Sequence, residues 1–250
     1  VPSKSPSGQS RPGKKIGDPM TVKDIDETIE AFANAARAAK EIGFDGVEIH
    51  GAHGYIIDQF FWDGTNERAD RFGGDLPQRT SFAVEIVKAV RAATSPDFPI
   101  LLRFSQWKQQ DFSVRLAHTP QELEGFLAPL TKAGVDMFHC STRRFWEPEF
   151  PETGSDMNLA GWTKKISGVP TITVGSVSLN GDFITNGFTA NAELDTGAHL
   201  AGLVKMLDRG DFDLVAVGRA LIVNADWPKK VRAGHVDQLT PWSPQALQTL

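Results

Sequence analysis

Short apolar segments alternate with segments of helical periodicity along most of this chain, and no other feature of the sequence constrains the fold as strongly. The apolar segments have the composition of β-strands, and they fall at residues 46–50, 99–105, 135–141, 170–176 and 212–219. The remaining periodic segments are expected helices, and they fall at residues 24–42, 80–93, 119–133, 159–167, 199–208 and 226–233. A succession of five strand–helix units predicts a parallel sheet with helices packed outside it.

A (β/α)8 barrel and an open doubly wound sheet both satisfy this alternation, and two features favour the barrel. Polar residues or glycines stand at the C-terminal end of every expected strand, namely His50, Arg103, Ser105, His139, Ser141, Gly175, Ser176, Gly218 and Arg219. No Gly-x-Gly-x-x-Gly phosphate loop follows any of the strands. The sequence therefore predicts an α/β fold of the TIM-barrel type.

The composition narrows the class of protein further. Apolar residues make up 40% of the chain and charged residues 23%, which fits a globular protein with a sizeable core. The net charge of -5 argues against nucleic acid as a partner, and no apolar run approaches the roughly 20 residues of a membrane span. The lone Cys140 excludes an intrachain disulfide and, with no signal sequence at the start, predicts a cytoplasmic location.

The segment that ends the first expected strand carries a candidate site. The strand leads to His50 and His53, which are followed by Tyr55, the only tyrosine in the chain. Alternation along a strand places Glu48 on the same face as His50. Imidazoles and phenols donate hydrogen bonds and can exchange protons. Such donors at one strand end suit a site that binds an oxygen or an anion and protonates an atom nearby.

Two other interpretations of these histidines stay open. Histidines at a strand end are often hydrogen-bonded surface residues without a catalytic role. A metal-dependent barrel lyase or hydrolase would use His50, His53 and His139, because neighbouring imidazoles can bind zinc. We rank this alternative third and expect no metal ligands, because no nearby carboxylate completes a ligand set at a familiar spacing.

Two glycine-containing pairs at the ends of the last two expected strands indicate a phosphate site. They are Gly175-Ser176 and Gly218-Arg219. The last two strand–helix loops of a barrel commonly bind phosphate, glycines let backbone N–H groups approach it, and a guanidinium binds two of its oxygens. A tight turn explains either pair alone, whereas the two pairs together with Arg219 favour phosphate.

Longer motifs resemble the Old Yellow Enzyme family of flavin-dependent ene-reductases, a group of NADH:flavin oxidoreductases. They comprise Gly43 to Tyr55, Asp58-Gln59-Phe60, Asn66, Arg68, Asp70, Phe72-Gly73-Gly74, Arg79, Arg103, Gly175-Ser176 and residues 213–220. The resemblance covers nearly the whole chain after residue 20. Residues 140–150 are similar to a loop of the xenobiotic-reductase-like members.

The resemblance implies a TIM barrel that binds FMN and takes electrons from NADH or NADPH. It implies that His50 and His53 hold an oxygen of the substrate and that Tyr55 donates a proton to a substrate carbon. Residues matching the family's cofactor contacts are Arg103, Gly175, Ser176, Gly218 and Arg219. The implied function is reduction of activated alkenes such as enones, with nitro compounds or nitrate esters as further candidate substrates.

Two aromatic residues in the 140–150 segment are candidates for substrate binding. Phe145 and Trp146 are expected to line a hydrophobic pocket for the small-molecule substrate, although aromatics that only hold a loop against the barrel explain them equally well. Cys140 is expected to be a buried small residue rather than a nucleophile.

The chain departs from the family in its length. The family's barrel has eight strands, whereas residues 21–250 supply only about strands 4 to 8 and would form the C-terminal portion of one flavin-binding domain. Residues 1–20 are expected to form an irregular arm. We favour a truncated or cleaved product, whose partner would be a complementary N-terminal fragment or another copy of the chain. A catalytically incomplete barrel fragment is therefore the alternative function.

Smaller departures fall at three places. Residues 184–196 are rich in Asn, Thr and Ala and are expected to form a surface excursion. Asp75 and Gln78 stand where the family usually has serine and asparagine, and these changes are expected to affect local packing.

Overall fold

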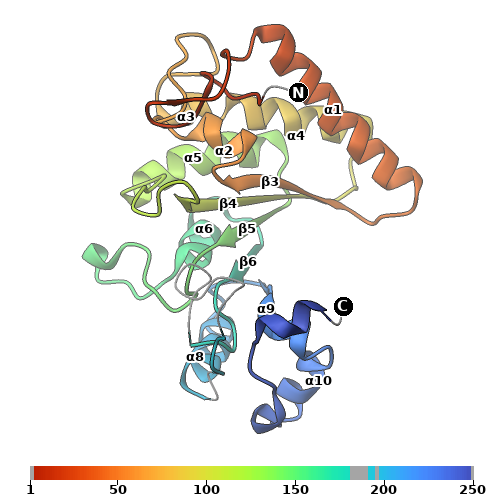
Figure 1. The fold of residues 1–250 in the computed structure, drawn as a ribbon, viewed down its shortest axis with the longest axis vertical. Helices are drawn as coiled ribbons and strands as arrows, with labels where there is room; N and C mark the ends of the chain where they lie inside the picture. The colour runs from red at the N-terminus through yellow and green to blue at the C-terminus, as the bar shows by residue number, and fades with distance from the viewer. Residues whose placement is uncertain (1–2, 181–190, 195–196, 249–250) are drawn as a thin grey trace. The chain divides into compact units, whose positions relative to one another are not determined.

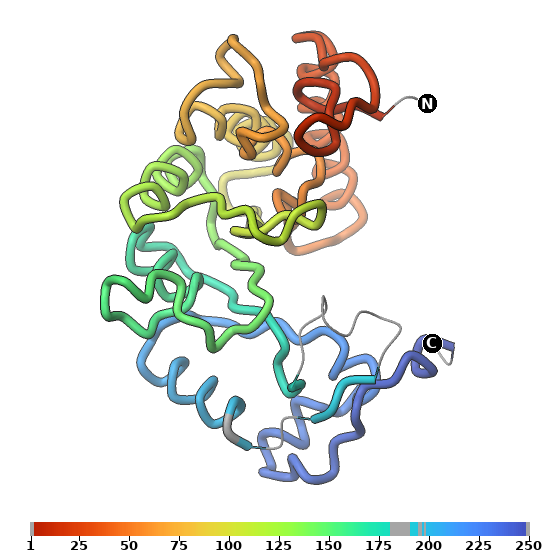
Figure 2. The backbone as a smooth tube through the Cα atoms, turned by 60° about the vertical axis from the view of Figure 1, so that its left-hand side comes forward, coloured from red at the N-terminus to blue at the C-terminus, as the bar shows by residue number. Residues whose placement is uncertain are grey.

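The computed structural model describes residues 3–180, 191–194 and 197–248. The chain forms two compact units, the first comprising residues 1–139 and 163–170 and the second residues 140–162 and 171–250. Figure 2 follows the chain from the N-terminus in the first unit to the C-terminus in the second. Each unit is described by itself below. In the described part of the chain, no helix is both long enough and apolar enough to cross a membrane.

Five strands form the predicted parallel sheet. They are β3 (Val47–His53), β4 (Ile100–Lys108), β5 (Met137–Ser141), β6 (Thr171–Val174) and β7 (Leu214–Val215). Their order in the sheet is the order of the sequence. A doubly wound sheet would reverse its order at a switch point, so the sequential order is that of part of a barrel. The expected α/β fold is confirmed.

The predicted helices are found within two residues of their expected ends. They are α1 (Val22–Glu41), α4 (Ser81–Ala93), α5 (Pro120–Ala133), α6 (Leu159–Ser167), α8 (Ala198–Asp208) and α10 (Trp227–Arg232). Local chemistry explains three of the boundaries. Thr21 and Asp24 form a reciprocal capping box at the start of α1, and Thr119 caps α5, which ends at Gly134 in the left-handed conformation.

In the first unit, α1, α4 and α5 lie on the same side of β3 and β4 (Figure 1). The core between these layers is aromatic and aliphatic. Phe104 on β4 contacts Phe126 on α5, with ring centroids 5.2 Å apart, and it also meets Phe138 on β5 at 5.9 Å. Ile49 and Leu102 are buried on the same face of the sheet. The opposite face of the two strands is therefore left for polar residues.

The structure contains short elements that periodicity did not predict. In the first unit these are α2 (Ile56–Phe61) and α3 (Leu76–Arg79), and in the second unit α9 (Arg219–Val223). The 3₁₀ turns are η1 (Pro151–Thr153), η2 (Val236–Gln238) and η3 (Pro244–Gln248). Most of α2 is buried, so it shows no polar face from which a helical pattern could be read.

The last expected strand is much shorter than predicted. Only Leu214 and Val215 belong to β7, and they pair in parallel with β6. Gly218 then precedes α9, so that Arg219 lies in a helix rather than at a strand end. The chain leaves the sheet here because Ala220 packs into a separate core with Leu179, Ala192 and the fully buried Trp242. The prediction of a strand over residues 212–219 is therefore right only for Leu214 and Val215.

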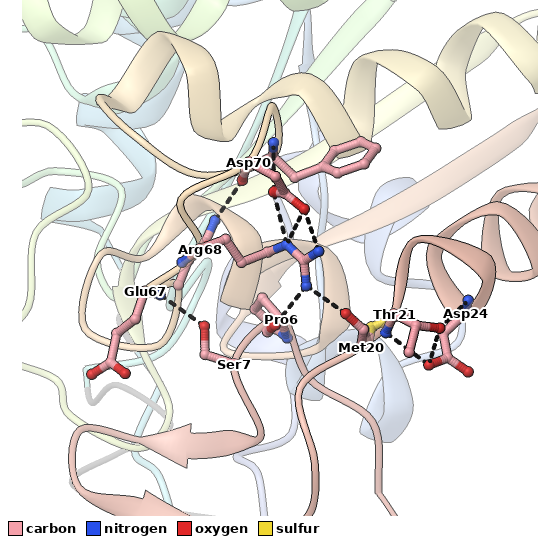
Figure 3. Close-up of polar contacts among 10 residues, drawn as sticks. Pro6, Ser7, Met20, Thr21, Asp24, Glu67, Arg68 and Asp70 are labelled. Atoms are coloured by element: carbon pink, nitrogen blue, oxygen red, sulfur yellow. Dashed lines mark hydrogen bonds and ion pairs between the residues drawn. The ribbon is translucent and has the colours of Figure 1, made fainter.

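The N-terminal arm is more regular than expected. β1 (Gln9–Arg11) and β2 (Lys14–Lys15) form a two-stranded antiparallel sheet within residues 1–20. Figure 3 shows how Arg68 holds this arm from both sides: its guanidinium donates hydrogen bonds to the carbonyls of Pro6 (3.0 Å) and Met20 (2.5 Å). Asp70 pairs with the same guanidinium. The arm is thus anchored by charged hydrogen bonds.

We expect Arg68→Ala to lower the free energy of unfolding by about 1–3 kcal/mol, because it removes charge-assisted hydrogen bonds and leaves two carbonyls without their donor. Arg71→Ala is the matched control in the same segment. Its main ion pair, with Glu85, is solvent-exposed, so its loss should cost less than about 1 kcal/mol. Urea denaturation measures both values, and equal effects of the two substitutions would contradict the anchoring role of Arg68.

Candidate active site

The register between β3 and β4 builds the polar face of the first unit. The two strands run parallel, and His50 is the direct partner of Arg103. Side chains of paired residues in a parallel ladder point to the same face, and Glu48 lies two residues earlier on that face. His139 on β5 joins them, since its Nδ1 lies 2.7 Å from a Glu48 carboxylate oxygen. Four residues from three strands therefore form one polar cluster.

Burial and charge set the protonation of this cluster. Partial burial raises the pKa of Glu48, but the hydrogen bond from His139 and the positive charge of Arg103 outweigh it, so the net pKa lies below the usual value. Burial lowers the pKa of the Arg103 guanidinium, an effect that Glu48 opposes. Burial and the charge of Arg103 lower the pKa of His50. The face thus carries an anion, a cation and a weakly basic imidazole.

The structure brings the predicted His50, His53 and Tyr55 together. β3 continues three residues beyond its expected end and bulges between Gly51 and His53. The His50 ring lies 5.2 Å from the His53 ring and 5.4 Å from the Tyr55 ring, centroid to centroid. Tyr55 is 55% exposed, so its phenol is accessible. Two imidazoles and a phenol therefore lie within one small region.

His53 has surroundings that keep it neutral. Its ring stacks on Trp107 with centroids 4.5 Å apart, and its backbone N–H donates to the Ser105 hydroxyl at 3.0 Å. Burial lowers the pKa of His53 to about 3, and the charges of Arg103, His50 and Lys108 act in the same direction. A neutral imidazole offers one donor and one acceptor nitrogen. His53 is therefore suited to hydrogen bonding rather than to carrying charge.

Three residues of this region were given no role from the sequence. Trp107 stacks on His53, and Lys108 forms a fully buried ion pair with Asp58. Asp58 was recognised only as part of a motif, without a role. The three depend on contacts between positions about 50 residues apart, which no local pattern reveals; the only sequence signal is that Trp107 and Lys108 lie just past an expected strand end.

The second unit holds the residues predicted to bind phosphate. β6 and β7 pair in parallel, so that the turns after them lie at the same edge of the sheet. Gly175 has a φ of +142°, and a Cβ there would lie 2.7 Å from the Thr142 hydroxyl, which explains the glycine. A Cβ on Gly218 would meet nothing within 4 Å, and the neighbouring Arg219 is only 8% exposed. Open backbone beside an arginine fits an anionic group.

The other predicted residues of the second unit lie as follows. Ser176 has a φ of +53° and donates from its hydroxyl to the Arg143 carbonyl at 3.0 Å. Phe145 is fully buried, whereas Trp146 is partly exposed and stacks on His199 with centroids 3.7 Å apart. Cys140 is buried, as expected.

Two predictions concern absent or undescribed features. Among the described residues, no group of three or more His, Cys, Asp or Glu side chains is arranged to hold a metal ion. The predicted insertion at residues 184–196 lies outside the described part of the chain except for residues 191–194.

The comparisons with known proteins agree in one family. The sequence model of the NADH:flavin oxidoreductase / NADH oxidase family matches residues 3–238. An NADH oxidase of Thermoanaerobacter brockii is 35% identical over 88% of this chain and 31% of its own length. A cinnamate reductase of Clostridium sporogenes is 30% identical over 89% of this chain and 33% of its own length. An NADPH dehydrogenase of Geobacillus thermodenitrificans is 31% identical over 91% of this chain and 59% of its own length.

Solved structures agree on the fold. A structure of morphinone reductase in complex with tetrahydroNAD superposes with a TM-score of 0.74 and 22% identity, covering 98% of this chain and 63% of that one. A structure of an old yellow enzyme homologue from Zymomonas mobilis superposes with a TM-score of 0.72 and 22% identity. The match covers 96% of this chain and 63% of that one. The chain thus matches part of a TIM barrel and spans from 31% to 63% of the length of these relatives and solved structures.

We expect the His53 imidazole to stay neutral down to a pH of about 3. An unfolded histidine binds its proton near pH 6.5, so between these values the unfolded state binds more protons, and the free energy of unfolding decreases as the pH is lowered from 6.5 to 3. NMR titration of the imidazoles, assigned with His53→Gln, measures this. The same signal in urea-unfolded protein should titrate near pH 6.5, and a midpoint near that value in the folded protein would contradict the neutral state.

Proposed function

Because the chain belongs to the NADH:flavin oxidoreductase / NADH oxidase family, which includes the Old Yellow Enzymes, we propose that it acts as an FMN-dependent NAD(P)H oxidoreductase reducing activated alkenes. The observation that carries the proposal is the grouping of His50, His53 and Tyr55 beside Arg103 on one face of the first unit. The family uses FMN and NAD(P)H. Nitro compounds and nitrate esters are further candidate substrates, since they also present an oxygen that gains negative charge.

The two imidazoles suit the activating oxygen of the substrate. Reduction of an enone builds negative charge on its carbonyl oxygen, and preorganised donors stabilise such charge in the transition state. Neutral His50 and His53 with adjacent rings can both donate to one oxygen. The nearby Arg103 adds positive charge to the same face. We therefore assign the two histidines to the binding and polarisation of the substrate.

Tyr55 suits the role of proton donor. Its ring lies 5.4 Å from His50 and is more than half exposed, so a substrate held by the histidines would lie within reach of the phenol. Reduction of a carbon–carbon double bond needs a proton at the carbon that does not receive hydride. Among the described residues close to the two imidazoles, Tyr55 is the one that offers an exposed hydroxyl.

Each unit carries residues that match the family's cofactor contacts. In the first unit Arg103 suits the flavin ring, and in the second unit Gly175, Ser176, Gly218 and Arg219 suit the phosphate. The glycine turns at the ends of β6 and β7, with open space at Gly218 and a buried guanidinium beside it, have the donor chemistry that a phosphate needs. When bound, FMN supplies the hydride and accepts electrons from NAD(P)H. Trp146 is partly exposed and remains a candidate for the substrate pocket. Phe145 is buried, and its ring packs edge-on against the Trp146 ring.

The relatives support the substrate class. Cinnamate reductase and a rice protein named putative 12-oxophytodienoate reductase 3 carry names that refer to conjugated alkenes. The chain spans only part of each, so the activity of the whole protein, with a complementary N-terminal segment or a second copy as partner, is itself part of the proposal. A catalytically incomplete barrel fragment is the second candidate.

Absorbance spectroscopy separates these candidates. We expect purified protein, reconstituted with FMN, to show flavin absorbance that NAD(P)H bleaches and 2-cyclohexenone restores. Gly218→Asp adds a negative side chain beside Arg219 and should weaken FMN binding, as measured by fluorescence titration of the protein with FMN. A fluorescence titration that finds no FMN binding to the unsubstituted protein would contradict the proposal and favour the incomplete fragment.

We expect Tyr55→Phe to slow reoxidation of reduced flavin by 2-cyclohexenone by about 10²–10⁴-fold, because loss of a general acid costs that much. Reduction of the flavin by NAD(P)H needs no proton from Tyr55 and should keep its rate. Stopped-flow absorbance measures the two half-reactions separately. An equal loss in both would show that Tyr55 is not the proton donor.

A further inference from the structure

The turn that carries His53 and Tyr55 has an unfavourable backbone. β3 bulges before His53, whose φ is +64°, and Gly54 follows at +77°. Left-handed conformations of non-glycine residues are uncommon and persist when their surroundings hold them. Its positive φ would strain any other residue, and a Cβ at Gly54 would lie 1.8 Å from the Gln110 amide oxygen and displace that side chain. The surroundings of Gly54 therefore determine where the two neighbouring rings lie.

Side chains hold the Gly54 residue at both of its backbone polar groups. Its N–H donates to the Asp58 carboxylate at 2.7 Å, while its carbonyl accepts from the amides of Gln59 at 2.8 Å and Gln110 at 3.1 Å. Asp58 and Gln59 belong to α2, and Gln110 follows β4. The turn is thus fixed between a helix and a strand end that lie far apart in the sequence.

The acceptor of the Gly54 N–H, Asp58, is part of a fully buried ion pair. Asp58 is fully buried, and its other carboxylate oxygen pairs with the ammonium of Lys108, which is also fully buried. Burial raises the pKa of Asp58, whereas the Lys108 charge and the Gly54 N–H lower it. Lys108 is the register partner of His53. The ion pair therefore lies directly beneath the turn.

Stability alone does not account for this pair. Desolvating two charges costs several kcal/mol per ion, and well-packed apolar residues can replace a buried ion pair without loss of stability. Apolar residues could not accept the Gly54 N–H, nor could they place a positive charge beside His53. The pair is therefore better explained by what it does to the turn.

We propose that the buried Asp58 side chain is the positioning group for the His53–Gly54–Tyr55 turn: its oxygen accepts the Gly54 N–H, and Lys108 balances the charge that burial of the carboxylate would otherwise leave unpaired. Neither residue touches the substrate. The inference rests on the proposed function only in that the turn presents His53 and Tyr55 to the substrate; its structural part is independent of any activity.

The test compares two double variants that differ in a single group. Asp58→Asn/Lys108→Met removes both charges but keeps a carbonyl oxygen that can accept the Gly54 N–H. Asp58→Leu/Lys108→Met also removes both charges, with the same branched shape at position 58, but has no acceptor. Circular dichroism checks that both fold. If the leucine variant does not fold, Asp58→Ala/Lys108→Met replaces it, because alanine cannot overpack the site.

The first readout does not depend on activity. Tyr55 is the only tyrosine, so protein labelled with 3-fluorotyrosine gives one ¹⁹F NMR signal that reports the order of the turn. We expect the asparagine variant to keep the parent's signal and the acceptor-free variant to shift and broaden it. An unchanged signal in the acceptor-free variant would overturn the proposal, and so would equal changes in both variants.

The second readout tests the consequence for catalysis. We expect the acceptor-free variant to slow flavin reoxidation by 2-cyclohexenone at least about 10-fold, because small misplacements of reacting groups are costly. Reduction by NAD(P)H should be unchanged, and the asparagine variant should restore reoxidation. If the parent protein has no enone activity, the proposed function fails while the ¹⁹F comparison still decides the positioning role. Normal reoxidation by the acceptor-free variant in an active parent would contradict that role.

Discussion

The parallel register between β3 and β4 is the interaction on which the candidate site depends. Pairing His50 with Arg103 sends both side chains to one face, and the same register buries Ile49, Leu102 and Phe104 against the helices. A slip of one residue would exchange these faces and bury the charged groups among aromatic rings. The cost of burying unpaired charge therefore fixes the position of the site as firmly as the apolar core fixes the fold.

Much of the fold could be predicted because its signals are local. Helix α1 is predicted by Thr21 and Asp24 at its start and by the spacing of its apolar residues. Helix α5 is predicted by Thr119 at its start and Gly134 at its end. The short α2 and α9 could not be predicted in this way. Helix α2 is buried nearly all round, and the chain leaves the sheet after Ala216 because a distant tryptophan, Trp242, completes the core that receives Ala220. Periodicity is read from a polar face exposed to solvent, which α2 lacks, and α9 is only five residues long.

The residues of the candidate site also differ in whether a local sequence signal identifies them. His50, His53 and Tyr55 could be singled out because a strand end, two glycines and the lone tyrosine stand together in one short segment. Trp107 and Lys108 could not, because their importance comes from contacts with His53 and Asp58 across the register of two strands. Sequence reasoning therefore singled out the groups proposed to meet a substrate, and the structure adds the groups that contact them.

The charges around His53 explain how these two sets act together. Arg103 and Lys108 both favour the neutral imidazole, and Lys108 can remain beneath the turn only because Asp58 balances its charge. A protonated His53 would add a third cation to a poorly solvated region, whereas a neutral one donates a hydrogen bond at little electrostatic cost. A substrate oxygen that gains negative charge would then accept hydrogen bonds from neutral imidazoles. The nearby positive charges of Arg103 and Lys108 would stabilise that oxygen further. The ion pair that holds the backbone of the turn thus also tunes the ring that the turn presents.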